Sequence, residues 1–204
     1  MTHPETAAAD IVDLYDRRSA DWIADRGVVL TEPDRTWLDR FTARLAPGDT
    51  VLDVGCGSGR PMAAELLERG YRVTGVDSSA RLVAHAAADL PAGRFVQGDM
   101  RTLDLGEIFT GILAWHSLFH LSPVDQRIAL PRLLAHAAPC ATIVFSSGPR
   151  EGDAVGIWRD EPLYHGSLNP EEYQALLTSQ GFRVESGARA DDGSVWLAHR
   201  MDGR

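Results

Sequence analysis

The chain has 204 residues, a formal net charge of −9 and 44% hydrophobic residues. This length is typical of one domain with a full-sized core, so we expect residues 1–204 to form a single domain. The acidic balance argues against nucleic-acid binding, which a basic patch normally supports. The first residues lack the features of a signal peptide, and no apolar run is long enough to cross a bilayer. We therefore expect a cytoplasmic protein that contacts no membrane.

Lysine is absent, and all 20 basic residues are arginine. The chain therefore has no residue for a lysine Schiff base or a lysine-bearing P-loop. The two cysteines, Cys56 and Cys140, are far apart in the sequence and predict neither a disulfide framework nor a zinc site.

Residues 5–26 have the periodicity of one helix, with large and charged side chains at steps of three and four. This stripe consists of Ile11, Tyr15, Arg18, Trp22 and Arg26. Aromatic and arginine side chains on one stripe are typical of a flap that closes over a polar, anionic ligand. Packing of the aromatics, with the arginines directed to solvent, is an equally good interpretation. A second helix is predicted for residues 34–45, and we expect residues 1–46 to form a helical lid over a core of residues 47–204.

From residue 50 onward, predicted strands and helices alternate. The strands are predicted at residues 50–54, 72–76, 94–97, 111–115, 141–146, 182–186 and 194–199, and the helices at 59–69, 79–88, 123–137 and 170–179. This alternation indicates βαβ units and a mostly parallel sheet with helices on both faces. The link between the last two strands is polar, contains Asp191 and Asp192, and is too short for a crossover helix, so these strands should pair antiparallel. Residues 147–169 are predicted to form a long loop.

The first predicted strand ends in three glycines at alternate positions, Gly55, Gly57 and Gly59. Because glycine has no Cβ, a ligand can lie directly on this backbone, and the N–H groups of the next helix point at it. A dinucleotide-binding loop has the pattern Gly-x-Gly-x-x-Gly, but Arg60 stands at the position of its last glycine. The loop therefore favours a different nucleotide cofactor.

Carboxylates accompany the ends of three successive predicted strands. Asp53, in the first strand, can fix the turn through backbone N–H groups and attract an ammonium group. Asp77 ends the second strand, about 20 residues after Gly57, where an acid can bind both ribose hydroxyls. Asp99 follows the third strand and can accept from an adenine amino group while Met100 packs on the ring. Such an acidic cleft suits a cofactor that carries positive charge.

With these motifs in register, residues 50–200 resemble the class I S-adenosylmethionine-dependent methyltransferases, and in particular their small-molecule branch. The resemblance implies a Rossmann-like α/β fold with seven strands in the order 3-2-1-4-5-7-6, the seventh antiparallel. It also implies S-adenosyl-L-methionine as cofactor, S-adenosyl-L-homocysteine as product and a small-molecule acceptor. The residues that it assigns to the cofactor are Tyr15, Trp22, Arg26, Asp53, Gly55, Cys56, Gly57, Gly59, Asp77, Ser78, Asp99 and Met100.

Two histidines, His116 and His120, follow the fourth predicted strand, and one helical turn would place both on the same face. We expect His116 to act as a general base or to hydrogen-bond the substrate, because a neutral histidine accepts a proton near neutral pH. His120 is the second catalytic candidate, although a structural role beneath the cofactor is the preferred interpretation. A metal site is disfavoured because no third ligand is evident.

An acceptor pocket is predicted beside these histidines, for a small ring-bearing or acidic molecule. Its residues would be Trp115, His116, Trp158, Tyr164 and His165, and the alternative for the last three is a packed loop. The predicted function is methyl transfer from S-adenosylmethionine to an oxygen or nitrogen of a small molecule. Three alternatives remain open: a methyltransferase for a peptide side chain or carboxyl group, an NAD(P)-binding oxidoreductase, and a non-catalytic S-adenosylmethionine-binding protein.

Overall fold

The computed structural model describes residues 3–190 and 193–201. Its strands are β1 (Thr50–Val54), β2 (Arg72–Asp77), β3 (Arg94–Gln97), β4 (Phe109–Ala114), β5 (Ala137–Ser147), β6 (Gly152–Trp158), β7 (Glu161–Ser167), β8 (Phe182–Ala190) and β9 (Gly193–Arg200). Its α-helices are α1 (Pro4–Ala9), α2 (Ile11–Arg17), α3 (Ser19–Arg26), α4 (Glu32–Thr42), α5 (Met62–Glu68), α6 (Ala80–Asp89), α7 (Pro123–Ala135) and α8 (Pro170–Ser179). A short 3₁₀ helix covers Leu118–His120.

Seven strands form the central sheet in the order β3-β2-β1-β4-β5-β9-β8. Strands β1 to β5 are parallel, and β9 runs antiparallel to both of its neighbours, as expected. The strand labels differ from the expected order because β6 and β7 form a separate two-stranded sheet and so shift the numbers of the last two strands. The fold is the expected mostly parallel, Rossmann-like α/β sheet.

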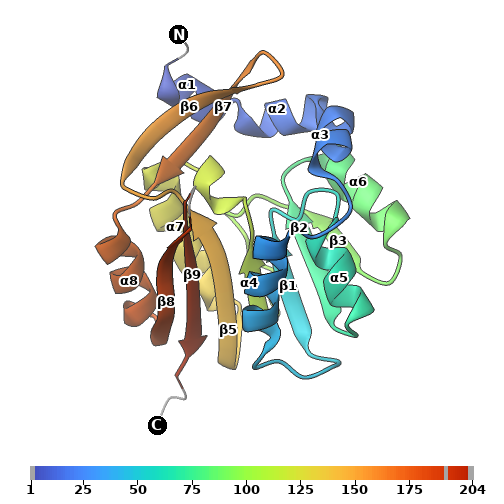
Figure 1. Ribbon diagram of the computed structural model, residues 1–204, viewed down its shortest axis with the longest axis vertical. Helices are drawn as coiled ribbons and strands as arrows, with labels where there is room; N and C mark the ends of the chain where they lie inside the picture. Colours follow the sequence, from blue (N-terminus) through green and yellow to red (C-terminus); the bar gives the residue numbers. More distant parts are fainter. Residues whose placement is uncertain (1–2, 191–192, 202–204) are drawn as a thin grey trace.

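Apolar side chains pack against both faces of this sheet. Helices α4 and α5 cover one face, while α7 and α8 cover the other (Figure 1). On the first face, Phe41 of α4 lies so close to β4 that a Cβ on Gly111 would meet its ring at 2.8 Å. A glycine in the middle of this strand therefore permits the close approach of α4 to the sheet. Within the described ranges, no helix has the length and apolar character needed to span a bilayer.

The structure corrects two expectations about the segments outside the sheet. Residues 5–26 are not one helix but three short ones, because the chain turns at Asp10 and Arg18. Residues 147–169 are not a loop, since most of them form the β6–β7 hairpin. The expected polar link before the last strand is also shorter, because β8 extends to Ala190, while Asp191 and Asp192 lie outside the described residues.

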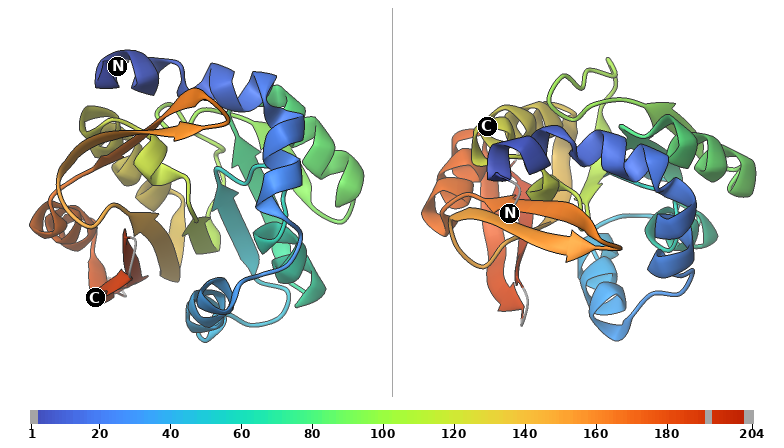
Figure 2. Two further views of the ribbon diagram at one scale, coloured as in Figure 1. Left: turned by 45° about the horizontal axis from the view of Figure 1, so that its top comes forward. Right: turned by 90° about the horizontal axis from the view of Figure 1, so that it is seen from above.

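The β6–β7 hairpin lies beside α1–α3 over one end of the sheet (Figure 2). Tyr164 of the hairpin is buried with Ala7, Ile11 and Leu14 of the N-terminal helices. We call α1–α3 together with this hairpin the lid. Helix α4 packs on the sheet face and does not belong to the lid.

Candidate active site

The loop that follows β1 is fixed by hydrogen bonds to the end of β2. The N–H of Gly55 donates to the carbonyl of Val76 at 2.7 Å. The carboxylate of Asp77 accepts the N–H of Gly57 at 2.8 Å with one oxygen and the N–H of Ser79 at 2.9 Å with the other. Burial raises the pKa of Asp77, and these N–H donors oppose the rise. One carboxylate therefore ties the glycine loop to the start of α6.

A Cβ on each of the three glycines would meet a different neighbour, which for Gly55 is the side chain of Ser117. Gly55 and Gly57 have left-handed φ angles of +72° and +56°, which favour glycine. A Cβ on Gly57 would lie 2.5 Å from the indole of Trp22, so this ring rests directly on the loop. A Cβ on Gly59 would instead meet Leu90 at 2.7 Å, and Gly59 therefore faces the core rather than a ligand.

Asp53 and Cys56 are buried beneath the loop, and they line neither of the two hollows described below. Asp53 is 3% exposed, and no hydrogen bond from a described residue reaches its carboxylate. Burial, with a smaller contribution from the charge of Asp77, raises the pKa of Asp53 to about 7. Burial likewise raises the pKa of the Cys56 thiol. The expectation that Asp53 fixes the turn is wrong, because the loop N–H groups of Gly55 and Cys56 donate to the Val76 carbonyl and that of Gly57 donates to Asp77.

A cavity of about 90 Å³, which we call the inner cavity, lies between the glycine loop and the lid. Its walls combine apolar side chains, such as Val76 and Leu82, with polar groups from the strand ends. The predicted site residues that line it are Tyr15, Trp22, Gly55, Gly57, Asp77, Ser78, Asp99, Met100, His116 and His120. The carboxyl ends of β1, β2, β3 and β4 therefore meet at one site, as expected for an open α/β sheet.

The carboxylate of Asp99 already has a partner within the chain. Both of its oxygens accept from the guanidinium of Arg101, over 2.5 and 3.0 Å, and Arg101 also contacts Asp125 at 3.4 Å. Burial alone would raise the pKa of Asp99, but the Arg101 hydrogen bonds lower it. Arg101 therefore holds the Asp99 carboxylate beside the inner cavity, and acceptance from an adenine amino group stays a prediction. The sequence analysis did not single out Arg101.

Both ring nitrogens of His120 are occupied by hydrogen bonds. Nδ1 donates to the carbonyl of Tyr164 at 3.0 Å, so Nε2 accepts from the hydroxyl of Tyr15 at 2.8 Å. Burial lowers the pKa of His120 to about 3 and raises that of Tyr15. His120 is therefore neutral and connects the lid to the sheet, which fits its structural interpretation and leaves no nitrogen for catalysis.

His116 follows β4 in the left-handed region, with φ +51°. Its N–H donates to Ser146 Oγ at 2.7 Å, and its Nε2 lies 3.5 Å from Oδ1 of the buried Asp34. The same oxygen accepts from Trp115 Nε1 at 2.8 Å. Burial alone would raise the pKa of Asp34, but hydrogen bonds from His116, Trp115 and Thr31 hold it well below its usual range. Asp34 therefore carries a negative charge beside His116.

Asp34 was not predicted as a site residue. In the sequence, Thr31 and Asp34 form the capping-box pattern of a helix start, and both capping hydrogen bonds are present. This signal predicts a helix start and gives no indication that Oδ1 of Asp34 also faces His116.

A second hollow of about 880 Å³, which we call the outer cleft, meets the inner cavity at His116. Trp115 and His165 line it as predicted. Arg26, which was expected beside the cofactor, lines this cleft and not the inner cavity. Trp37 and Phe119 contribute two further aromatic rings that the sequence analysis did not single out.

Trp158 and Tyr164 line neither the inner cavity nor the outer cleft. Tyr164 is 1% exposed inside the lid, where its hydroxyl donates to Asp153. The indole of Trp158 stacks on Tyr15 with a centroid distance of 6.1 Å. Their expected place in the acceptor pocket is therefore wrong, because the hairpin turns them toward the N-terminal helices.

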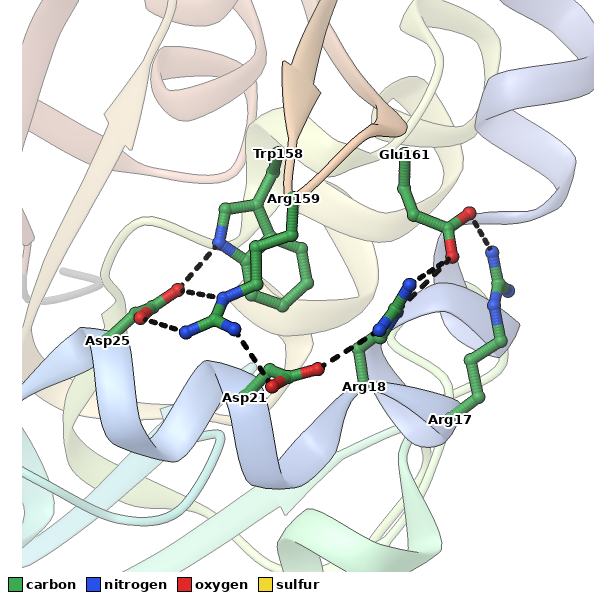
Figure 3. A network of polar contacts seen from close by, with 7 residues as sticks. All are labelled: Arg17, Arg18, Asp21, Asp25, Trp158, Arg159 and Glu161. Atoms are coloured by element: carbon green, nitrogen blue, oxygen red, sulfur yellow. Dashed lines mark hydrogen bonds and ion pairs between the residues drawn. The ribbon is translucent and has the colours of Figure 1, made fainter.

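Charged side chains join the turn of the hairpin to α2 and α3 (Figure 3). Arg159 contacts Asp25 at 2.7 Å and Asp21 at 3.0 Å, and Trp158 Nε1 donates to Asp25 at 3.0 Å. On the other side of the turn, the carboxylate of Glu161 contacts two arginines of the lid. These are Arg17 at 2.7 Å and Arg18 at 3.2 Å. We call this network the clasp.

Residues 51–139 match the family model described as a methyltransferase domain. An O-methyltransferase of Pyrenophora dematioidea is 29% identical over 153 residues, which cover 69% of this chain and 57% of the relative. A trans-aconitate 2-methyltransferase of Paracidovorax citrulli is 44% identical over 131 residues, which cover 57% of this chain and 49% of the relative. The chain therefore spans about half the length of these curated relatives.

Solved structures share the fold at low sequence identity. The 1,6-didemethyltoxoflavin-N1-methyltransferase of Burkholderia thailandensis, with bound 1,6-didemethyltoxoflavin and S-adenosylhomocysteine, aligns with a TM-score of 0.73 and 23% identity, covering 99% of this chain and 92% of that chain. The sheet order and the glycine loop define a Rossmann-like nucleotide-binding fold. Within this fold, residues 51–139 match the methyltransferase-domain family, in agreement with the resemblance of the sequence to the class I S-adenosylmethionine-dependent methyltransferases.

Because Arg159 is part of the clasp, we expect Arg159→Ala to make the lid more mobile without unfolding the core. Amide hydrogen exchange in α3 should become several-fold faster, because Arg159 contacts both Asp21 and Asp25. The matched control is Arg127→Ala, which removes an exposed two-hydrogen-bond pair with Glu172 between α7 and α8. Equal exchange rates in α3 for Arg159→Ala and the wild type would contradict the clasp.

Because the pKa of His120 is lowered in the folded protein, we expect the protein to lose stability as the pH falls. This pKa is about 3 in the folded protein and about 6.5 in the unfolded chain, so only the unfolded chain binds the proton between these values. The free energy of unfolding should therefore fall with pH by up to about 1.4 kcal/mol per unit below pH 6, relative to His120→Gln. Denaturant titrations of both proteins from pH 7 to pH 4 measure this difference.

Comparing the wild type with His120→Gln also cancels the opposing effect of Asp53 on the free energy of unfolding. The raised pKa of that carboxyl adds stability as the pH falls below about 7, equally in both proteins. Parallel pH profiles for the wild type and His120→Gln would show that His120 does not titrate as described.

Proposed function

We propose that the chain transfers a methyl group from S-adenosyl-L-methionine to an oxygen or nitrogen of a small-molecule acceptor. The observation that carries this proposal is the meeting of two hollows at His116, one beside the glycine loop and one lined by aromatic side chains. A cofactor in the first and an acceptor in the second would come together at that residue. The names of the curated relatives, O-methyltransferase and trans-aconitate 2-methyltransferase, support this class of reaction.

The residues of the inner cavity fit an S-adenosyl group. Gly57 presents backbone without a side chain, as a ligand that lies on the loop requires, and Gly55 also lines the cavity. The Asp77 carboxylate, although it accepts two backbone N–H groups, lines the cavity and has further lone pairs for ribose hydroxyls. Val76 and Met100 supply apolar surface for an adenine ring.

The lid must move outward before a cofactor enters. The inner cavity holds about 90 Å³, less than the cavity of about 150 Å³ that accommodates a single benzene ring. The indole of Trp22 rests on Gly57 and the ring of Tyr15 lines the same cavity, so these side chains fill the space above the loop. We propose that α1–α3 and the hairpin open and close together, because the clasp joins them.

When bound, S-adenosylmethionine would supply a methyl group on a sulfonium sulfur; the lone pair of the acceptor atom would form the new bond to carbon, and sulfur would keep the electrons of the broken bond. His116 removes the acceptor proton. With its Nε2–H directed to Asp34, its Nδ1 holds the lone pair that accepts this proton. The charge of Asp34 stabilises the imidazolium that results, in the way an aspartate supports histidine in hydrolase triads. The Ser146 hydrogen bond fixes the backbone of His116.

The direct test of the proposal is turnover. Protein incubated with S-adenosylmethionine that carries a labelled methyl group should transfer the label to a member of a panel of phenols, amines, carboxylates and peptides. S-adenosylhomocysteine should form in equal amount. Transfer only to peptides would favour the peptide alternative, and binding of NADH but not of S-adenosylhomocysteine would contradict the proposal.

Asp77→Ala should weaken S-adenosylhomocysteine binding by about 1–3 kcal/mol, because hydrogen bonds to a charged group are lost and the loop is no longer tied to α6. Isothermal titration calorimetry measures the change. The matched control is Asp104→Ala, since Asp104 also accepts a backbone N–H, that of Gly106, but in a turn outside the site. If a folded Asp77→Ala protein binds S-adenosylhomocysteine with unchanged affinity, Asp77 does not contribute to cofactor binding.

His116→Ala should lower kcat by about 100-fold and leave S-adenosylhomocysteine affinity nearly unchanged, because the residue acts on the acceptor proton. The measurement uses an acceptor that the panel identifies. His85→Ala, at an exposed position on α6, serves as the control and should keep full activity. If His116→Ala is also fully active, catalysis depends on proximity alone and the base role is withdrawn.

A further inference from the structure

We propose that the outer cleft binds an aromatic acceptor that carries a single carboxylate, and that Arg26 selects this charge. The inference rests on the proposed function, since it names the acceptor class of the same site. It is carried by an arginine without a partner, by a wall of aromatic rings and by the position of His116 between the two hollows.

Arg26 differs from the other half-buried arginines in the described part of the chain, because its guanidinium has no ion pair or hydrogen bond with a described residue. The others each have an ion pair or a hydrogen bond; they are Arg18, Arg35, Arg40, Arg60, Arg69, Arg101 and Arg200. No described residue forms either contact with the guanidinium of Arg26, which lines the outer cleft. A partly desolvated charge without a counterion is costly, and a ligand carboxylate would satisfy it with paired hydrogen bonds.

The carboxylate of Asp34, which lines the same cleft as Arg26, already has other partners. One of its oxygens faces Trp115 and His116, and the other accepts the N–H of Thr31 at 3.4 Å. Its charge and that of Arg26 still influence each other, since Arg26 helps to lower the pKa of Asp34. Because this nearby negative charge opposes a doubly charged ligand, the cleft favours a carboxylate over a phosphate monoester.

One wall of the outer cleft is a series of rings in contact. Trp115 lies 5.1 Å from His116, which lies 6.1 Å from Phe119, which in turn lies 5.2 Å from His165, all between ring centroids. Trp37 also lines the cleft. Such surfaces bind planar rings through offset or edge contacts. An aromatic acid would therefore place its ring on this wall, its carboxylate at Arg26 and its reacting hydroxyl or amine toward His116.

Matched pairs of probes test the charge preference without requiring turnover. The pairs are 4-hydroxybenzoate with 4-hydroxybenzamide, and 6-hydroxy-2-naphthoate with its amide, which differ only in charge. With S-adenosylhomocysteine present at saturation, calorimetry should show about tenfold tighter binding of at least one carboxylate than of its amide. Arg26→Met should abolish this preference, while Arg132→Met, at an exposed position on α7, should keep it.

Equal binding of carboxylate and amide in both pairs, a preference that survives in Arg26→Met, or no binding of either carboxylate would overturn the inference. Binding of S-adenosylhomocysteine to the same proteins separates this inference from the proposed function. Retained cofactor binding with no charge preference contradicts the aromatic-acid acceptor alone. Absence of cofactor binding in the wild type contradicts the proposed function itself.

Discussion

The carboxylate of Asp77 is the constraint on which the rest of the site depends. By accepting the N–H groups of Gly57 and Ser79, it holds the loop after β1 against the start of α6. The loop then lies open toward the lid, where Trp22 rests on it. The same strand edge carries His116, which joins the inner cavity to the outer cleft. Both the inner cavity and the outer cleft therefore lie at the end of the parallel sheet, where ligands bind in open α/β folds.

The sheet could be predicted from the sequence, and the lid could not. Strands β1 and β3 and helix α8 have the predicted bounds, because short apolar runs and helix start signals are local features of the sequence. The β6–β7 hairpin was missed because its turn is Arg159-Asp160, whose left-handed φ angles of +48° and +66° normally call for Asn-Gly. Ion pairs of Arg159 with α3 stabilise this turn. Contacts between segments so far apart in the chain cannot be predicted from the sequence around the turn.

The lining of the inner cavity was predicted more completely than that of the outer cleft. Gly55, Gly57 and Asp77 were found because fixed spacings after β1 and β2 define them. The outer cleft depends on which distant segments pack together, so Asp34 was missed and Tyr164 was misplaced. Asp53 was also assigned the wrong role. Its position just before the glycines suggested that it fixes the loop, but the N–H of Gly57 donates to Asp77.

A crystal structure of the wild-type chain with S-adenosylhomocysteine tests the central claim most directly. The account predicts ribose hydroxyls on Asp77, the adenine against Val76 and Met100, the sulfur facing His116, and the indole of Trp22 displaced from Gly57. A ligand bound elsewhere on the chain, or one bound in the inner cavity without any displacement of Trp22, would contradict it.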